Sequence, residues 1–212
     1  MNHEKFLKYS SALFIATGLI LLLGPKSIFP SFYHPIFLGI FFLLSPFLAY
    51  IPVPVLKKDE SLNRSSLLRI RSSIAFALLI NNTGELGLFK MNVIGFEYDK
   101  FAHFLVCMLF AFMLGEYLTV NKKLSFQKVV MTVMTSIFVS GLIWELFEAS
   151  SDIFFHTEEW GIYGRAIFPD TMRDIFFNTI GIVTGIILLS FPSPTFKKDN
   201  KSERVTGIEP VA

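Results

Sequence analysis

The segment Phe101–Val120 reads FAHFLVCMLFAFMLGEYLTV and has the length and composition of a membrane-spanning helix. A helix needs about 20 predominantly apolar residues to cross the hydrocarbon core of a bilayer. At the start of this segment, however, two ionisable residues, Asp99 and His103, are spaced four residues apart. The sequence therefore predicts a transmembrane helix that begins at a polar site.

Five further segments of similar character alternate with short polar stretches, and they cover residues 9–23, 32–51, 72–89, 129–147 and 172–191. Hydrophobic residues make up 52% of the 212 residues and charged residues only 17%, which is typical of a membrane chain. We expect an all-α polytopic membrane protein, a six-helix transmembrane bundle that forms one domain over residues 1–192. The polar tail over residues 193–212 is expected to be disordered and cytoplasmic.

The Lys and Arg residues divide unequally between the two sets of loops, and this division predicts the orientation. If six spans alternate, one side of the membrane receives fourteen of these residues and the other side receives five. The five are Lys26, Lys90, Lys100, Arg165 and Arg173. We therefore expect both termini in the cytoplasm and residues 24–31, 90–100 and 149–171 outside.

Ionisable residues gather at the span ends that this orientation places outside. Within each span they are three or four residues apart, so that they share one helix face. They are Asp99 with His103, Glu145 with Glu148, and Asp170 with Asp174 and the amide Asn178. Glu85, with Asn81 and Asn82, repeats the pattern at the end of the third span. A charge in hydrocarbon costs about 2.5–3.5 kcal/mol on insertion scales, so several at one depth indicate a site.

The residue types suggest roles within this site. The candidate catalytic residues are Asp99, His103, Glu145, Glu148, Asp170 and Asp174, and the candidate substrate-binding residues are Asn178, Arg173 and Arg165. Like charges at close range need a cation between them, and Lys100, Arg165, Arg173, a protonated His103 or a metal could supply it. Carboxylates with one His suit Mg²⁺, Mn²⁺, Ca²⁺ or Zn²⁺. The candidate ligands of such a divalent ion are Asp99, His103, Glu145 and Asp174.

Structural interpretations compete with this one. Asp170 can simply cap the sixth helix, because an acidic residue in the first turn favours the helix dipole. Asp99 and Lys100 can form an ordinary interfacial pair. Glu145 lies too deep for a capping role, since Leu146 and Phe147 follow it. The whole set can also be a hydrogen-bond network that only holds helices together.

Three pieces of the sequence resemble one family. They are Tyr98-Asp99-Lys100-Phe101-Ala102-His103-Phe104, then Trp144-Glu145-Leu146-Phe147-Glu148, then Asp170-Thr171-Met172-Arg173-Asp174 with Asn178 and Gly181. Over residues 70–190 the chain resembles VanZ-like membrane proteins, and among these the YjdF-type inner-membrane proteins. The resemblance implies a multi-pass protein of the bacterial cytoplasmic (inner) membrane. It does not imply a mechanism.

The depth of the polar groups suggests the function. They meet at head-group level, so we expect an enzyme or binder that acts on a lipid or lipid-linked cell-envelope molecule. A cation or proton transporter is the first alternative, although transporter sites usually lie near the bilayer midplane. A structural or accessory protein is the second. No nucleophile elbow or H-E-x-x-H helix is present, so hydrolysis would need metal-bound water with a carboxylate base. The net charge of +2 is too small to suggest a nucleic-acid partner.

The orientation can be tested with reporter fusions after Pro192. A reporter that works only in the cytoplasm should be active there, because the positive residues keep this end of the chain inside. The same reporter inserted in residues 90–100 should be inactive. An external-only reporter that is active after Pro192 would reverse the orientation and move the site to the cytoplasmic face.

Overall fold

The computed structural model describes residues 2–25, 35–51, 53, 62, 64–155 and 167–191. This part of the chain contains six long helices: α1 (His3–Leu23), α2 (Pro35–Leu48), α4 (Arg64–Glu85), α5 (Tyr98–Val120), α6 (Phe126–Phe155) and α7 (Ile167–Leu189). Each of the six predicted segments overlaps one of them. The tail over residues 193–212 lies outside the described residues.

A small element that we did not predict connects α4 to α5. After the 3₁₀ turn η2 (Leu88–Lys90), the strands β1 (Asn92–Val93) and β2 (Phe96–Glu97) form an antiparallel hairpin. Both turn residues, Ile94 and Gly95, have positive φ angles of 51° and 82°, as a two-residue I′ turn requires. The hairpin leads directly into the first residue of α5.

Four of the described helices are long and apolar enough to cross a membrane, namely α1, α5, α6 and α7. Helix α2 is apolar but has only 14 residues. Helix α4 has 22 residues, but Arg64, Arg69 and Arg71 make its first two turns polar. The helical membrane class is thus confirmed with four candidate spans, and six spans stay a prediction that depends on α2 and α4.

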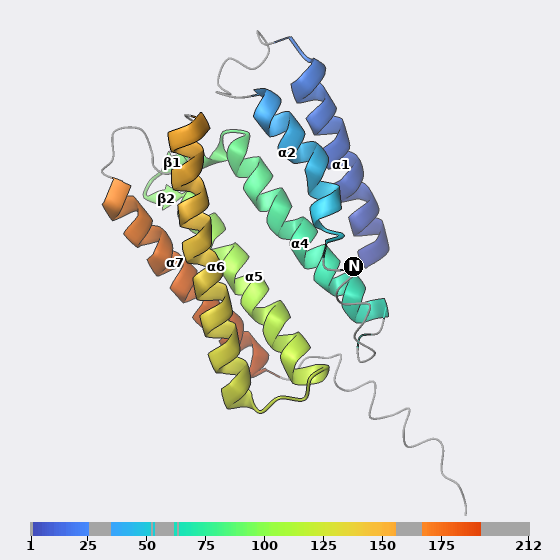
Figure 1. The fold of residues 1–212 in the computed structure, drawn as a ribbon, viewed down its shortest axis with the longest axis vertical. Helices are drawn as coiled ribbons and strands as arrows, with labels where there is room; N and C mark the ends of the chain where they lie inside the picture. The colour runs from blue at the N-terminus through green and yellow to red at the C-terminus, as the bar shows by residue number, and fades with distance from the viewer. Residues whose placement is uncertain are drawn as a thin grey trace, which may run out of the picture.

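The helices form two groups (Figure 1). In the first, α1 and α2 pack side by side against α4 around Phe14 and Phe42. In the second, α5, α6 and α7 pack around Ala111, Val133 and Ile182. Helices α4 and α5 join the two groups, and the Arg69 guanidinium lies 2.7 Å from the Glu116 carboxylate between them.

Glycines let α5 and α7 approach at backbone distance. A methyl group at Gly185 would lie 2.5 Å from the Met108 carbonyl oxygen, and one at Gly181 would collide with the Phe104 carbonyl oxygen. Small residues at this four-residue spacing are typical of close helix contacts in membranes. The tight packing brings the polar start of α7 against the polar start of α5.

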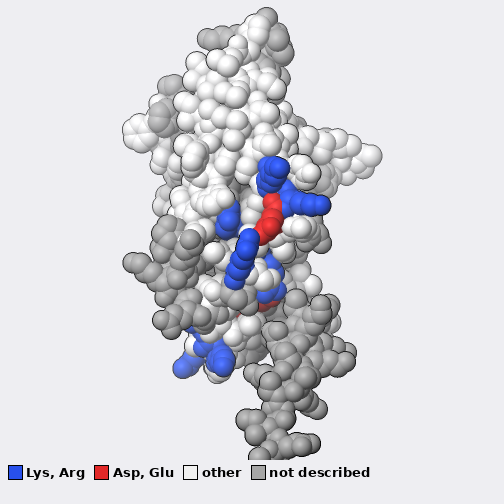
Figure 2. All heavy atoms as spheres, turned by 90° about the vertical axis from the view of Figure 1, so that its right-hand side faces the viewer, with Lys and Arg blue, Asp and Glu red and all other residues white. Residues whose placement is uncertain are grey.

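The surface is divided between apolar and charged areas. Figure 2 shows a broad area without charged side chains, above a band in which Lys and Arg side chains lie together with Asp or Glu. This band lies toward the level where α4 begins. Large apolar side chains such as Leu23, Met131 and Leu146 are more than half exposed. A polar band beside a lipid-compatible surface is what a membrane-embedded bundle needs.

The α5–α7 contact can be tested with Gly181→Val. The added side chain has no room beside the α5 backbone, so the free energy of unfolding should fall by about 1–3 kcal/mol or more. Val183→Leu on the same helix is the control, because Val183 is 41% exposed. Thermal unfolding in detergent measures both, and equal melting of Gly181→Val and the parent would contradict the packing.

Candidate functional site

The first turn of α5 is held in place by Tyr98. Its hydroxyl donates a hydrogen bond to the Ile80 carbonyl of α4 at 2.9 Å and lies 2.8 Å from the Thr83 hydroxyl. The preceding residue, Glu97, has the extended backbone usual for an N-cap position. Asp99, one residue into the helix, therefore projects from a rigidly attached helix end.

Lys100 is the centre of the polar cluster. Its ammonium nitrogen lies 2.8 Å from Asp99 Oδ2, 2.7 Å from Asp170 Oδ1 and 2.6 Å from Asp174 Oδ1. The ammonium donates hydrogen bonds to Asp99 and Asp174 and forms an ion pair with Asp170. Lys100 is only 2% exposed, so these ion pairs form away from bulk water. Lys100 is therefore a core member of the site and not just an interfacial partner of Asp99.

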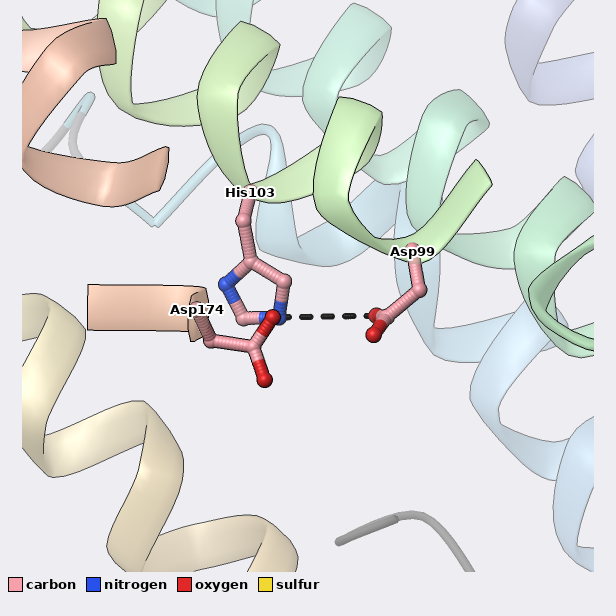
Figure 3. A group of neighbouring side chains, drawn as sticks. All are labelled: Asp99, His103 and Asp174. Carbon is pink, nitrogen blue, oxygen red and sulfur yellow. Dashed lines mark ion pairs between the residues drawn. The ribbon is translucent and has the colours of Figure 1, made fainter. Parts of the chain in front are cut away.

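His103 separates the cluster into two halves. Its Nε2 atom lies 3.5 Å from an oxygen of Asp99 and 3.5 Å from an oxygen of Asp174, and Figure 3 shows the ring facing both carboxylates on this side. Its Nδ1 atom points the other way, 3.2 Å from Asn178 Oδ1 and 4.0 Å from Glu145 Oε1. One nitrogen thus faces the half that contains Lys100, and the other faces α6.

Helix α6 supplies the second half. Glu145 is 6% exposed, and no described residue donates a hydrogen bond to either of its carboxylate oxygens. Glu148, one turn later, accepts a hydrogen bond from the Trp144 indole nitrogen. His103, Glu145 and Glu148 place potential ligand atoms within 4.8 Å of one another, as do Asp99, His103 and Asp174 on the other side.

The structure brings the six ionisable residues into one buried cluster, in which contacts link them through Lys100 and His103. Their roles as site residues stay a prediction. Asn178 lies one turn deeper on α7, where it also accepts a hydrogen bond from the Cys107 thiol at 3.1 Å. Asp170 lies inside the first turn of α7, where an acidic residue favours the helix dipole, and its carboxylate pairs with Lys100.

Three other candidates lie elsewhere. The side chain of Arg173 is 45% exposed and pairs with Glu97 at 2.9 Å, so it stands beside the buried cluster instead of neutralising it. Asn82 donates a hydrogen bond to Ser45 on α2, within the first helix group. Arg165 lies outside the described residues.

The cluster has a surplus of negative charge. Five ionised carboxylates would face one ammonium group and one imidazole, even if the imidazole is protonated. Several charges of one sign in a low-dielectric environment are unfavourable without compensation. The arrangement can therefore take up protons, a cation, or a ligand rich in hydrogen-bond donors.

The central role of Lys100 can be tested with Lys100→Met. The substitution leaves the buried carboxylates of Asp170 and Asp174 without their cation, and it should lower the free energy of unfolding by about 3–5 kcal/mol. Arg173→Met removes a cation from an exposed pair and should cost about 0–1 kcal/mol. Thermal unfolding in detergent compares the two, and a small effect of Lys100→Met would remove the lysine from the centre of the cluster.

Comparison with known proteins places the chain in a family. A family model described as "Predicted membrane protein (DUF2238)" matches residues 9–193. Neither the curated proteins nor the solved structures give a match. The match covers both helix groups and the whole polar cluster. Because it extends over most of the sequence, the chain belongs to this family of predicted membrane proteins.

Proposed function

We propose that the chain is a bacterial cytoplasmic-membrane protein with both termini inside and the polar cluster facing out. There it binds or acts on a lipid or lipid-linked molecule of the cell envelope. The supporting observation is the position of the cluster, which lies at the starts of α5 and α7 and near the end of α6. Charged groups at span ends lie at head-group depth, where a membrane-bound substrate presents its polar part.

The negative charge of the cluster limits which chemical groups of a ligand can bind there. The carboxylates are acceptors, and the Lys100 ammonium is already paired with three of them. A head group with hydroxyl or ammonium donors therefore suits the site directly. A phosphate group would be repelled unless a divalent cation stood between it and the carboxylates. If the site hydrolyses its ligand, such a cation would activate the water, with a carboxylate as the base.

A structural role is the second candidate, and the Lys100 ion pairs favour it. They connect α5 to α7 without an external ligand, as expected for a network that holds helices together. Glu145 does not fit this role, because it contributes buried charge without a hydrogen bond from a described residue. A transport path has less support, since backbone contacts at Gly181 and Gly185 fill the α5–α7 interface below Asn178.

The variant Glu145→Gln distinguishes a ligand-binding role of the cluster from a role in holding the helices together. The amide keeps the size of the side chain and removes a buried charge, so the protein should unfold at the parent temperature or above it. The parent, purified in mild detergent and incubated with a bacterial polar-lipid extract, should retain a lipid species that the variant loses. Native mass spectrometry detects this retention.

The control is Glu116→Gln, which makes the same change near the opposite end of α5 and should retain the lipid. Equal lipid retention by the parent and Glu145→Gln would contradict the proposed function. A loss of several kcal/mol of stability in Glu145→Gln would instead assign the carboxylate to the helix-holding network.

A further inference from the structure

The geometry points to a divalent-cation site formed by His103 Nδ1, Glu145 and Glu148, with Asn178 Oδ1 as a neighbouring oxygen ligand. This inference rests on the proposed function, because it names the cation that would work in the same outward-facing cluster. The ligand set differs from the one that sequence alone suggested, since Asp99 and Asp174 are not in it.

Glu145 is the first observation. Its side chain is 6% exposed, and no described group donates a hydrogen bond to its two oxygens. His103 Nδ1 lies 4.0 Å from Glu145 Oε1, beyond hydrogen-bond distance. A buried carboxylate in such surroundings is unfavourable by itself, and it becomes favourable when a cation binds between it and its neighbours.

The orientation of His103 is the second observation. Nδ1 faces Glu145 and Asn178, whereas Nε2 faces the carboxylates of Asp99 and Asp174. Metal-bound histidines almost always direct their other ring nitrogen to a carboxylate, carbonyl or water, which sets the tautomer and the ring orientation. The half of the cluster that contains Lys100 therefore positions the imidazole, and the other half offers ligand atoms.

The spacing of these ligand atoms fits one ion. Nδ1 and Asn178 Oδ1 lie 3.2 Å apart. Two ligands bound at about 2.0–2.2 Å in tetrahedral or octahedral geometry are about 3.0–3.5 Å apart. His103, Glu145 and Glu148 have ligand atoms within 4.8 Å of one another, close enough to contract around an ion. Trp144 donates to Glu148 Oε1 and so orients its carboxylate.

The opposite triad of Asp99, His103 and Asp174 is less suitable for a metal. The Lys100 ammonium lies 2.8 Å from Asp99 and 2.6 Å from Asp174, where a metal ion would have to bind. Two cations side by side repel each other, and the ammonium already occupies the position between these carboxylates. A cation is therefore more favourable on the α6 side of the imidazole.

The ligand atoms also indicate which ion would bind. An imidazole nitrogen with carboxylate and amide oxygens suits a first-row transition ion such as Mn²⁺ or Zn²⁺. Mg²⁺ prefers oxygen ligands and retains several waters, so it competes poorly for a nitrogen-containing site.

Titration with Mn²⁺ tests the site. The full chain is purified in detergent and treated with EDTA, and the free Mn²⁺ signal is then followed by electron paramagnetic resonance. We expect one saturable ion per chain. Glu145→Gln and Glu148→Gln should each weaken binding by about 10-fold or more. Excess Zn²⁺ should displace the Mn²⁺, and the same concentration of Mg²⁺ should not.

Glu116→Gln is the matched control, because it makes the same change near the opposite end of α5, where Glu116 pairs with Arg69 and lies outside the cluster. Its Mn²⁺ affinity should stay within about threefold of the parent value. Absence of a saturable Mn²⁺ site in the parent would overturn the inference. So would Mn²⁺ binding by Glu145→Gln as strong as that of the parent. An equal loss of Mn²⁺ affinity in Glu116→Gln, with the variant still folded by thermal unfolding, would also overturn it.

Lipid retention by the EDTA-treated protein separates this inference from the proposed function. If the parent binds no Mn²⁺ but retains polar lipid in a manner that depends on Glu145, the cation site is wrong and the proposed function stands. If Mn²⁺ binds with the expected variant pattern and no lipid is retained, the proposed function is wrong and the cation site stands.

Discussion

An ammonium ion shared by three carboxylates joins the polar starts of α5 and α7. Lys100 on α5 reaches Asp170 and Asp174 on α7 at 2.7 and 2.6 Å, and all three side chains are almost completely buried. Separating such groups would leave uncompensated charge in a low-dielectric environment. Helices α5 and α7 are therefore coupled at their polar ends, and the glycines of α7 allow the backbones to approach below this point.

The same ion pairs explain why some carboxylates of the cluster have a partner and others do not. The carboxylates of α5 and α7 share Lys100, whereas Glu145 on α6 shares no hydrogen bond with a described group. His103 stands between the two halves, with one ring nitrogen toward each. One half of the cluster contains a cation and joins α5 to α7, and the other half has carboxylates without a paired cation and can accept a ligand.

Much of the site could be predicted because spacing along a helix is a local property. Asp99 and His103 are four residues apart, as are Asp170 and Asp174, so each pair had to share a helix face. The role of Lys100 was harder to predict, since a lysine next to an aspartate at a helix end usually remains in solvent. Its burial follows from contacts with residues about seventy positions away, which no local pattern encodes.

The apolar segments and the positions of their ionisable residues determined the helical membrane class and the level at which the site forms. These properties follow from hydropathy and helical periodicity, and both can be read from a local segment of about 20 residues. Only the tertiary structure decided which carboxylates share the ammonium group, that Arg173 pairs with Glu97, and that Glu145 has no such partner. The rotation of each helix about its axis and the identity of its neighbours come from packing between distant segments, and they decide which side chains meet.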